Sequence, residues 1–176
     1  GIDSAIVNLS FVKVPSSIEH VSFTNGAIAL PYWIDALLAD EAASFSTILG
    51  ASKIINYTYP SSLPSYDVAS KDAYGFSGFN AQQKAFSLLA LNYISSVVDV
   101  RFFETNNPSN FNTITFANNV QSGSSGYARN PDDAYTGNDL FLNAESGNLS
   151  PGDGQRSALV LIHELGHTLG LKHPGS

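Results

Sequence analysis

The sequence has no cysteine and no methionine among its 176 residues. Without cysteine the chain cannot form disulfides, zinc–thiolate sites or cysteine-ligated iron–sulfur clusters, and it has no thiol nucleophile. Only 13% of the residues are charged, with 8 Lys and Arg against 15 Asp and Glu. This acidic balance argues against nucleic-acid binding and against a basic helix on a membrane surface. The longest apolar run, Ala158 to Ile162, is far too short to cross a bilayer.

Apolar residues make up 43% of the chain and include 11 Phe and 8 Tyr. A chain of this length and composition can bury a sizeable core, so we expect a folded domain rather than disorder. The first residue is Gly1 and not Met, and we therefore interpret the chain as a processed or excised piece of a longer protein.

Hydrophobic periodicity predicts a mixed α/β fold in which strands and helices alternate. Strands are expected within 1–30 and at 53–59, 98–103, 113–117, 127–128 and 140–142, with a loop at 60–78. Helices are expected at 32–43, at 80–97 and near the C-terminus. In the helix at 80–97, Asn80 suits the N-cap and Gln83 completes a capping box. Its expected buried face consists of Ala81, Ala85, Leu88, Leu91 and Ile94, with Leu89, Tyr93 and Val97 beside it.

Three of the four histidines lie close together near the C-terminus, as His163, His167 and His173. A helix turns about 100° per residue, so His163 and His167 share one face and can bind one ion. Glu164 lies at the edge of that face, where it suits contact with a water molecule on the metal better than direct ligation. Two histidines four residues apart are often only surface residues, so this part of the pattern is a moderate signal.

His173 makes the pattern more specific, although a continuous helix would carry it about 240° away from His167. Gly170 lies between them and can adopt the left-handed conformation that ends a helix. The chain can then turn back and present His173 as a third ligand. Three neutral imidazoles leave tetrahedral zinc one open position for water, whose proton Glu164 can accept. The spacing therefore predicts a zinc site for peptide-bond hydrolysis.

This histidine pattern resembles the signature of the metzincin metalloproteases. The Pro174-Gly175 pair that follows it is similar to the serralysins, the secreted bacterial alkaline proteases. Further similarity covers roughly residues 32–175. It includes 34–38, 57–60, 79–84, 113–116, 126–128 and 139–143. Residues 1–31 are expected to form a strand-like extension, and 32–176 the N-terminal subdomain of a metzincin catalytic domain that ends just after the third zinc ligand.

The resemblance implies a twisted, mostly parallel sheet with one antiparallel edge strand, packed on two long helices. It also implies a secreted, extracellular zinc endopeptidase that acts on protein or peptide substrates. Gly126, Tyr127 and Ala128 would pair with an extended substrate backbone at the edge strand, although Tyr127 could instead simply fill a turn.

Two elements of the family are not found in this sequence. It has no Met-containing turn followed by a Tyr after the third histidine, and no glycine-rich repeats that bind calcium. The resemblance implies that calcium would bind a C-terminal repeat domain outside this chain. A complementary C-terminal fragment is a candidate partner. The alternative is a non-catalytic, zinc-containing module that binds peptides, or an inactive fragment that lacks the Met-containing turn.

The remaining candidate residues are interpreted as structural or solvated. His20 stands alone, which disfavours both the second, structural zinc site of the matrixins and a serine hydrolase. Asp132, Asp133 and Asp139 could contact calcium, but solvated loop carboxylates are the preferred interpretation.

Overall fold

The computed structural model describes residues 52–67, 71–109, 112–129, 131 and 138–173. All of them belong to one of the chain's two units, Pro31–Ser176, and only that unit is described. The strands expected within 1–30 and the helix expected at 32–43 lie outside the described residues. Within the described part, no helix has both the length and the apolar character needed to span a membrane.

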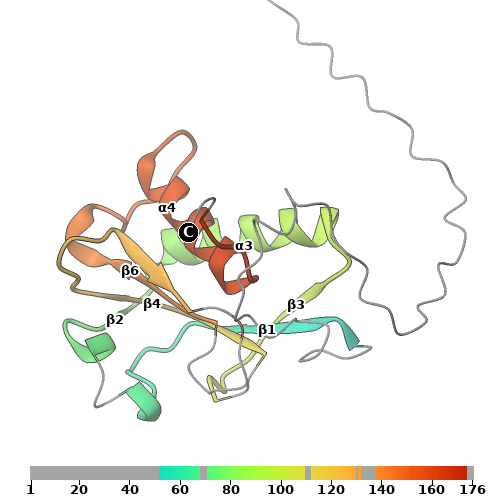
Figure 1. Ribbon diagram of the computed structural model, residues 1–176, viewed down its shortest axis with the longest axis horizontal. Coiled ribbons are helices and arrows are strands. Elements are labelled where there is room, and N and C mark those ends of the chain that lie inside the picture. The colour runs from blue at the N-terminus through green and yellow to red at the C-terminus, as the bar shows by residue number, and fades with distance from the viewer. Residues whose placement is uncertain (1–51, 68–70, 110–111, 130, 132–137, 174–176) are drawn as a thin grey trace, which may run out of the picture. The chain divides into compact units, whose positions relative to one another are not determined.

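A six-stranded mixed sheet forms the centre of the described unit (Figure 1). Its main path has the order β3-β1-β4-β6-β5. The strands are β1 (Ile54–Thr58), β3 (Arg101–Glu104), β4 (Thr113–Asn119), β5 (Gly126–Ala128) and β6 (Asp139–Asn143). All neighbours along β3-β1-β4-β6 are parallel, whereas β5 runs antiparallel to β6 at the edge. The expected mixed α/β fold and its antiparallel edge strand are therefore confirmed.

The segment expected to be a plain loop contains short regular elements. It holds two 3-10 turns, η2 (Ser65–Asp67) and η3 (Lys71–Ala73), and the strand β2 (Ser77–Gly78). β2 pairs antiparallel with the end of β4. Two-residue strands have no detectable hydrophobic period, so the sequence pattern could not predict this pairing.

Helices α3 (Ala81–Val97) and α4 (Arg156–Thr168) cover one face of the sheet (Figure 1). Every residue of β4 and β6 is buried, as expected for parallel strands in the interior of a sheet. The helices and central strands share one hydrophobic core, whose buried members include Ile55, Leu91, Ile114, Phe116, Leu140, Leu142, Leu161 and Leu165. This packing holds α4 firmly against the strands β5 and β6.

Helix α3 begins as predicted but buries a different face. Asn80 and Gln83 form the expected capping box. The backbone N–H of Gln83 donates to Asn80 Oδ1 at 2.9 Å, and the backbone N–H of Asn80 donates to Gln83 Oε1 at 3.0 Å. The buried residues are Gln83, Ser87 and Leu91, whereas Leu88 and Leu89 are exposed. The side chain of Gln83 donates to the Asn118 oxygen at 2.7 Å. A partner 35 residues away thus makes burial of a polar side chain favourable.

The interpretation of Asp139 as a solvated carboxylate is wrong, because it is fully buried at the start of β6. One of its oxygens accepts a 3.4 Å hydrogen bond from the Tyr66 hydroxyl, and the other has no partner among the described residues. Burial raises the pKa of Asp139 to about 8. A hydrogen bond from Thr115 acts to lower this pKa, whereas the charge of the nearby Asp67 carboxyl acts to raise it. Burial likewise raises the pKa of Asp67 to about 6. Asp132 and Asp133 lie outside the described residues.

We predict that Asp139→Asn makes the protein progressively more stable than the unchanged chain as the pH rises from 5 to 7.5. The folded state holds a proton on Asp139 up to about pH 8, whereas the unfolded chain loses it near 3.8. Unfolding therefore releases a proton in this window, and the free energy of unfolding falls as the pH rises. The difference should grow by on the order of 1 kcal/mol per pH unit.

Urea unfolding at several pH values measures this difference. Asp153→Asn, at an exposed turn before α4, is the control for the loss of one carboxylate. A constant difference between Asp139→Asn and the unchanged protein across the window would contradict the prediction.

Candidate metal centre

Helix α4 presents two of the three clustered histidines. Its buried residues are Ser157, Ala158, Leu161, Glu164, Leu165 and Thr168, a spacing that turns one stripe of the helix toward the sheet. His163 is exposed and His167 is half-buried, so both lie at the margin of that stripe. Their rings meet edge to face, with centroids 4.7 Å apart. The i, i+4 spacing thus places both imidazoles on one side of α4, as the sequence predicted.

The end of α4 reverses the chain direction through a glycine. Gly170 has φ +90°, in the left-handed region that was expected of it. Its N–H donates to the His167 carbonyl at 2.9 Å, and the Leu171 N–H donates to the Gly166 carbonyl at 3.1 Å. These two bonds form a Schellman motif, which satisfies carbonyls at the end of the helix. His173 follows this turn and returns to the other two histidines.

The Nε2 atoms of the three histidines converge on one point. They lie 2.9 Å apart between His163 and His173, and 3.2 Å apart from His167 to each of the others. Ligand nitrogens at about 2.0–2.1 Å from a tetrahedral zinc are about 3.3 Å from one another. The observed triangle is close to that size, so the donor set fits one zinc ion.

Hydrogen bonding alone does not explain this triangle. A neutral imidazole Nε2 carries either one proton or one lone pair, so it cannot serve two neighbours in the ring plane. The Nδ1 atom of His167 lies 2.6 Å from the Leu171 carbonyl oxygen, which can only accept. The proton of a neutral His167 is therefore on Nδ1, and the Nε2 lone pair faces the other two rings. Carbonyl groups orient metal-binding histidines in this way.

Glu164 lies beside the triangle in a confined position. The residue is 7% exposed. Burial raises the pKa of Glu164, while nearby His167 and His173 oppose that rise. A Cβ atom on Gly126 would lie 3.0 Å from Glu164 Cγ and 3.2 Å from the Phe141 carbonyl oxygen. The absence of a side chain at Gly126 therefore leaves the space that the Glu164 side chain occupies.

The hydrogen bonds of β5 show which of its backbone groups face outward. The Arg129 N–H donates to the Asp139 carbonyl, and the Ser125 carbonyl accepts from the Asn143 N–H, both at 2.9 Å. Antiparallel pairing alternates, so Tyr127 also directs its backbone groups toward β6. The backbone groups of Gly126 and Ala128 consequently point away from β6, toward the edge of the sheet that is free among the described strands.

The residues predicted as ligands, base and substrate edge meet at one open cleft of about 340 Å³. Its lining residues are Gly126, Tyr127, Ala128, Glu164, His167, Lys172 and His173. Sequence reasoning missed Lys172, although its place between the helix-ending Gly170 and His173 was a usable signal. His163 contacts the same centre through its Nε2 atom. His20 lies outside the described residues.

Comparison with known proteins gives sequence relatives but no matching protein-family model. The chain is 35% identical over 145 residues to the metallopeptidase AprA of Pseudomonas marginalis, which is 78% of this chain and 30% of that protein. It is 34% identical to a serralysin of Photorhabdus luminescens over 56% of this chain and 21% of that protein. For serralysin G of Dickeya chrysanthemi, identity is 30% over 73% of this chain and 28% of that protein.

The chain thus spans less than a third of the length of these relatives. The matches cover most of this sequence, and the names of the relatives agree with the chemistry of three clustered imidazoles beside a buried glutamate. The chain is therefore related to the serralysin-type metalloproteases, which confirms the resemblance seen in its sequence.

Proposed function

We propose that this protein is a zinc-dependent endopeptidase, with His163, His167 and His173 as the metal ligands and Glu164 as the general base. The observation that carries the proposal is the convergence of three Nε2 atoms within 3.2 Å of one another, next to a buried carboxyl group. The names of the metallopeptidase relatives support the same class of reaction.

The substrate would bind as an additional strand at the free edge of β5. The outward backbone groups of Gly126 and Ala128 supply the N–H donors and C=O acceptors for an extended peptide. Because Gly126 lies against Glu164, the added strand would pass directly beside that carboxyl group. The scissile bond would then lie in the cleft that Glu164, His167 and His173 line.

A zinc ion, when bound, supplies a Lewis acid that polarises a carbonyl and lowers the pKa of water. The protein's own residues carry out the proton transfers. A Glu164 carboxylate oxygen would accept a proton from the attacking water, and then donate it to the nitrogen of the leaving amine. Burial raises the pKa of Glu164, and this favours the second step, in which the protonated acid must form.

Several features of the whole protein are part of the proposal. They include residues 32–176 as the N-terminal subdomain of the catalytic domain, and secretion from the cell. A Met-containing turn, a calcium-binding repeat domain and a complementary C-terminal fragment remain predictions, as does the alternative of a non-catalytic peptide-binding module. Turnover by the zinc-loaded protein distinguishes the two functions, because a binding module would hold peptides without cleaving them.

We predict that Glu164→Gln keeps the bound zinc but lowers peptide turnover at least ~100-fold, the usual contribution of a general base. Glutamine preserves the shape of the side chain but cannot accept the proton from water. A quenched-fluorescent peptide assay measures turnover, and metal analysis of the same sample measures zinc. Equal turnover by the variant and the unchanged protein would remove Glu164 from the mechanism.

We predict that Gly170→Val weakens zinc binding by at least about tenfold, because a left-handed conformation costs a residue with a Cβ about 1–2 kcal/mol. The helix would tend to continue and carry His173 away from the other two ligands. Competition with a chelator measures the affinity. Gly147→Val is the matched control, since Gly147 has φ +75° at another turn and is not among the residues of the cleft. Unchanged affinity in Gly170→Val would show that Gly170 does not position His173.

A further inference from the structure

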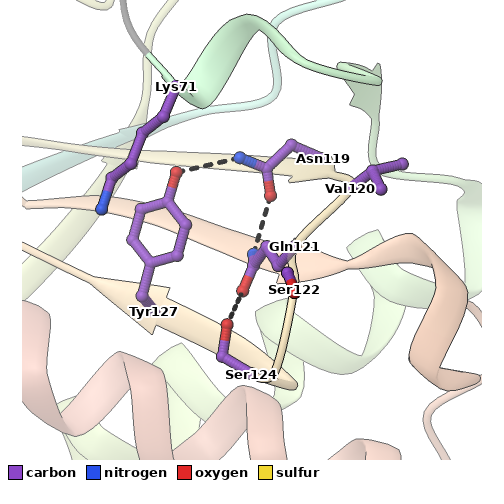
Figure 2. A pocket seen from close by; sticks show the side chains of 7 residues that line it. All are labelled: Lys71, Asn119, Val120, Gln121, Ser122, Ser124 and Tyr127. Atoms are coloured by element: carbon purple, nitrogen blue, oxygen red, sulfur yellow. Dashed lines mark hydrogen bonds between the residues drawn. The ribbon is translucent and has the colours of Figure 1, made fainter.

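The edge strand β5 has a second pocket on the face opposite the metal centre. Consecutive residues of a strand point to opposite faces, so Tyr127 points away from the side where Gly126 contacts Glu164. The pocket has a volume of about 200 Å³, and Figure 2 shows the residues that line it. The Lys71 ammonium lies over the Tyr127 ring, 4.9 Å from its centroid. A cationic group and an aromatic face therefore lie together beside the strand.

Hydrogen bonds fix the polar wall of this pocket. Asn119 Nδ2 donates to the Tyr127 hydroxyl at 2.9 Å, and Gln121 Nε2 donates to Asn119 Oδ1 at 2.7 Å. The Ser124 hydroxyl then donates to Gln121 Oε1 at 2.7 Å, which completes the chain drawn in Figure 2. The Tyr127 ring also stacks on Phe141. Tyr127 is thus held in place before any peptide arrives.

Strand pairing determines which substrate side chain would reach this pocket. We take the peptide to run antiparallel to β5. Gly126 and Ala128 direct their backbone groups outward, so Tyr127 would face a residue of such a peptide in a non-hydrogen-bonded pair. Side chains in such pairs are closest to each other and lie on the same face of the sheet. The substrate side chain opposite Tyr127 would therefore lie beside its ring and the Lys71 ammonium, whereas the flanking residues would point toward Glu164.

The charges around Lys71 make this position selective. The nearest carboxylate of its own segment, Asp72, is fully buried and is already paired with Arg129 at 2.6 Å. Asp72 also accepts a hydrogen bond from the Tyr127 hydroxyl. Within the described ranges the ion pairs are Lys53–Asp99 and Arg129–Asp72, and neither involves Lys71. Among the described residues that line this pocket, Lys71 is thus an exposed cation that neither of these ion pairs uses.

We propose that Lys71 and Tyr127 form a specificity subsite for an acidic substrate side chain, Asp or Glu, at the position that pairs with Tyr127. This inference rests on the proposed function, because it takes the peptide to bind along β5. It adds a preference that the metal centre does not determine. An exposed ion pair of this kind makes the affinity for a Glu peptide about two- to fivefold higher than for the matching Gln peptide. Added salt decreases this preference.

A set of fluorescent extended peptides tests the subsite. Each carries Glu or Gln at one position of an otherwise identical sequence, and fluorescence anisotropy measures its affinity for the zinc-loaded chain. We expect one position to favour Glu by about two- to fivefold, a preference that Lys71→Met removes and Lys71→Glu reverses. Lys84→Glu is the matched control, because the Lys84 ammonium lies 5.3 Å from the Tyr59 ring centroid, outside both pockets.

Three outcomes would overturn the subsite: no position that favours Glu, the same preference in Lys71→Glu as in the unchanged protein, or an equal effect of Lys84→Glu. Failure to bind any peptide would overturn it as well. The proposed function is tested separately by turnover of the same peptides. Peptides that bind with the expected preference and are never hydrolysed would support the subsite and contradict the endopeptidase.

Discussion

The metal centre depends on the reversal of the chain directly after helix α4. The Schellman turn at Gly170 ends the helix, returns His173 to the helix face and brings the Leu171 carbonyl to His167 Nδ1. In the proposed zinc site, the same turn would thus supply the third ligand and fix the tautomer of the second. A helix that continued by one more turn would separate His173 from the other two rings and would remove the carbonyl that orients His167.

Under the proposed function, the edge strand β5 would connect the metal centre to substrate recognition. On one face, Gly126 leaves room for the Glu164 side chain. On the other face, Tyr127 is anchored by Asn119 and by the buried Asp72. The outward backbone groups between these two faces are the ones that would pair with a peptide. Under the proposed function, this three-residue strand would therefore place a substrate beside Glu164 and also discriminate among its side chains.

Local spacing was enough to predict the main features of the site. The i, i+4 histidines, the left-handed glycine and the capping box at Asn80 each involve residues within one or two helical turns. Several of the expected strands also followed from period-2 patterns. These features were predictable because sequence neighbours determine them, whereas the antiparallel edge was expected from the family resemblance alone.

The features that could not be predicted depend on partners distant in the sequence. Gln83 is buried on α3 in place of Leu88 because Asn118 accepts its hydrogen bond. Asp139 is buried because β5 and the turn that carries Tyr66 cover the start of β6. The Lys71–Tyr127 pocket joins residues from η3 and β5, which no local pattern connects. Side-chain burial and the second face of β5 therefore required the tertiary structure.

X-ray absorption spectroscopy at the zinc edge of the zinc-loaded protein tests the central claim most directly. Three imidazole nitrogens at about 2.0–2.1 Å, with one or two oxygen ligands from solvent, are the expected first coordination sphere. The multiple-scattering features of imidazole report the number of histidine ligands. A zinc coordination sphere with two imidazoles and additional oxygens would contradict the three-histidine site, because it would show that the turn at Gly170 does not bring His173 to the metal.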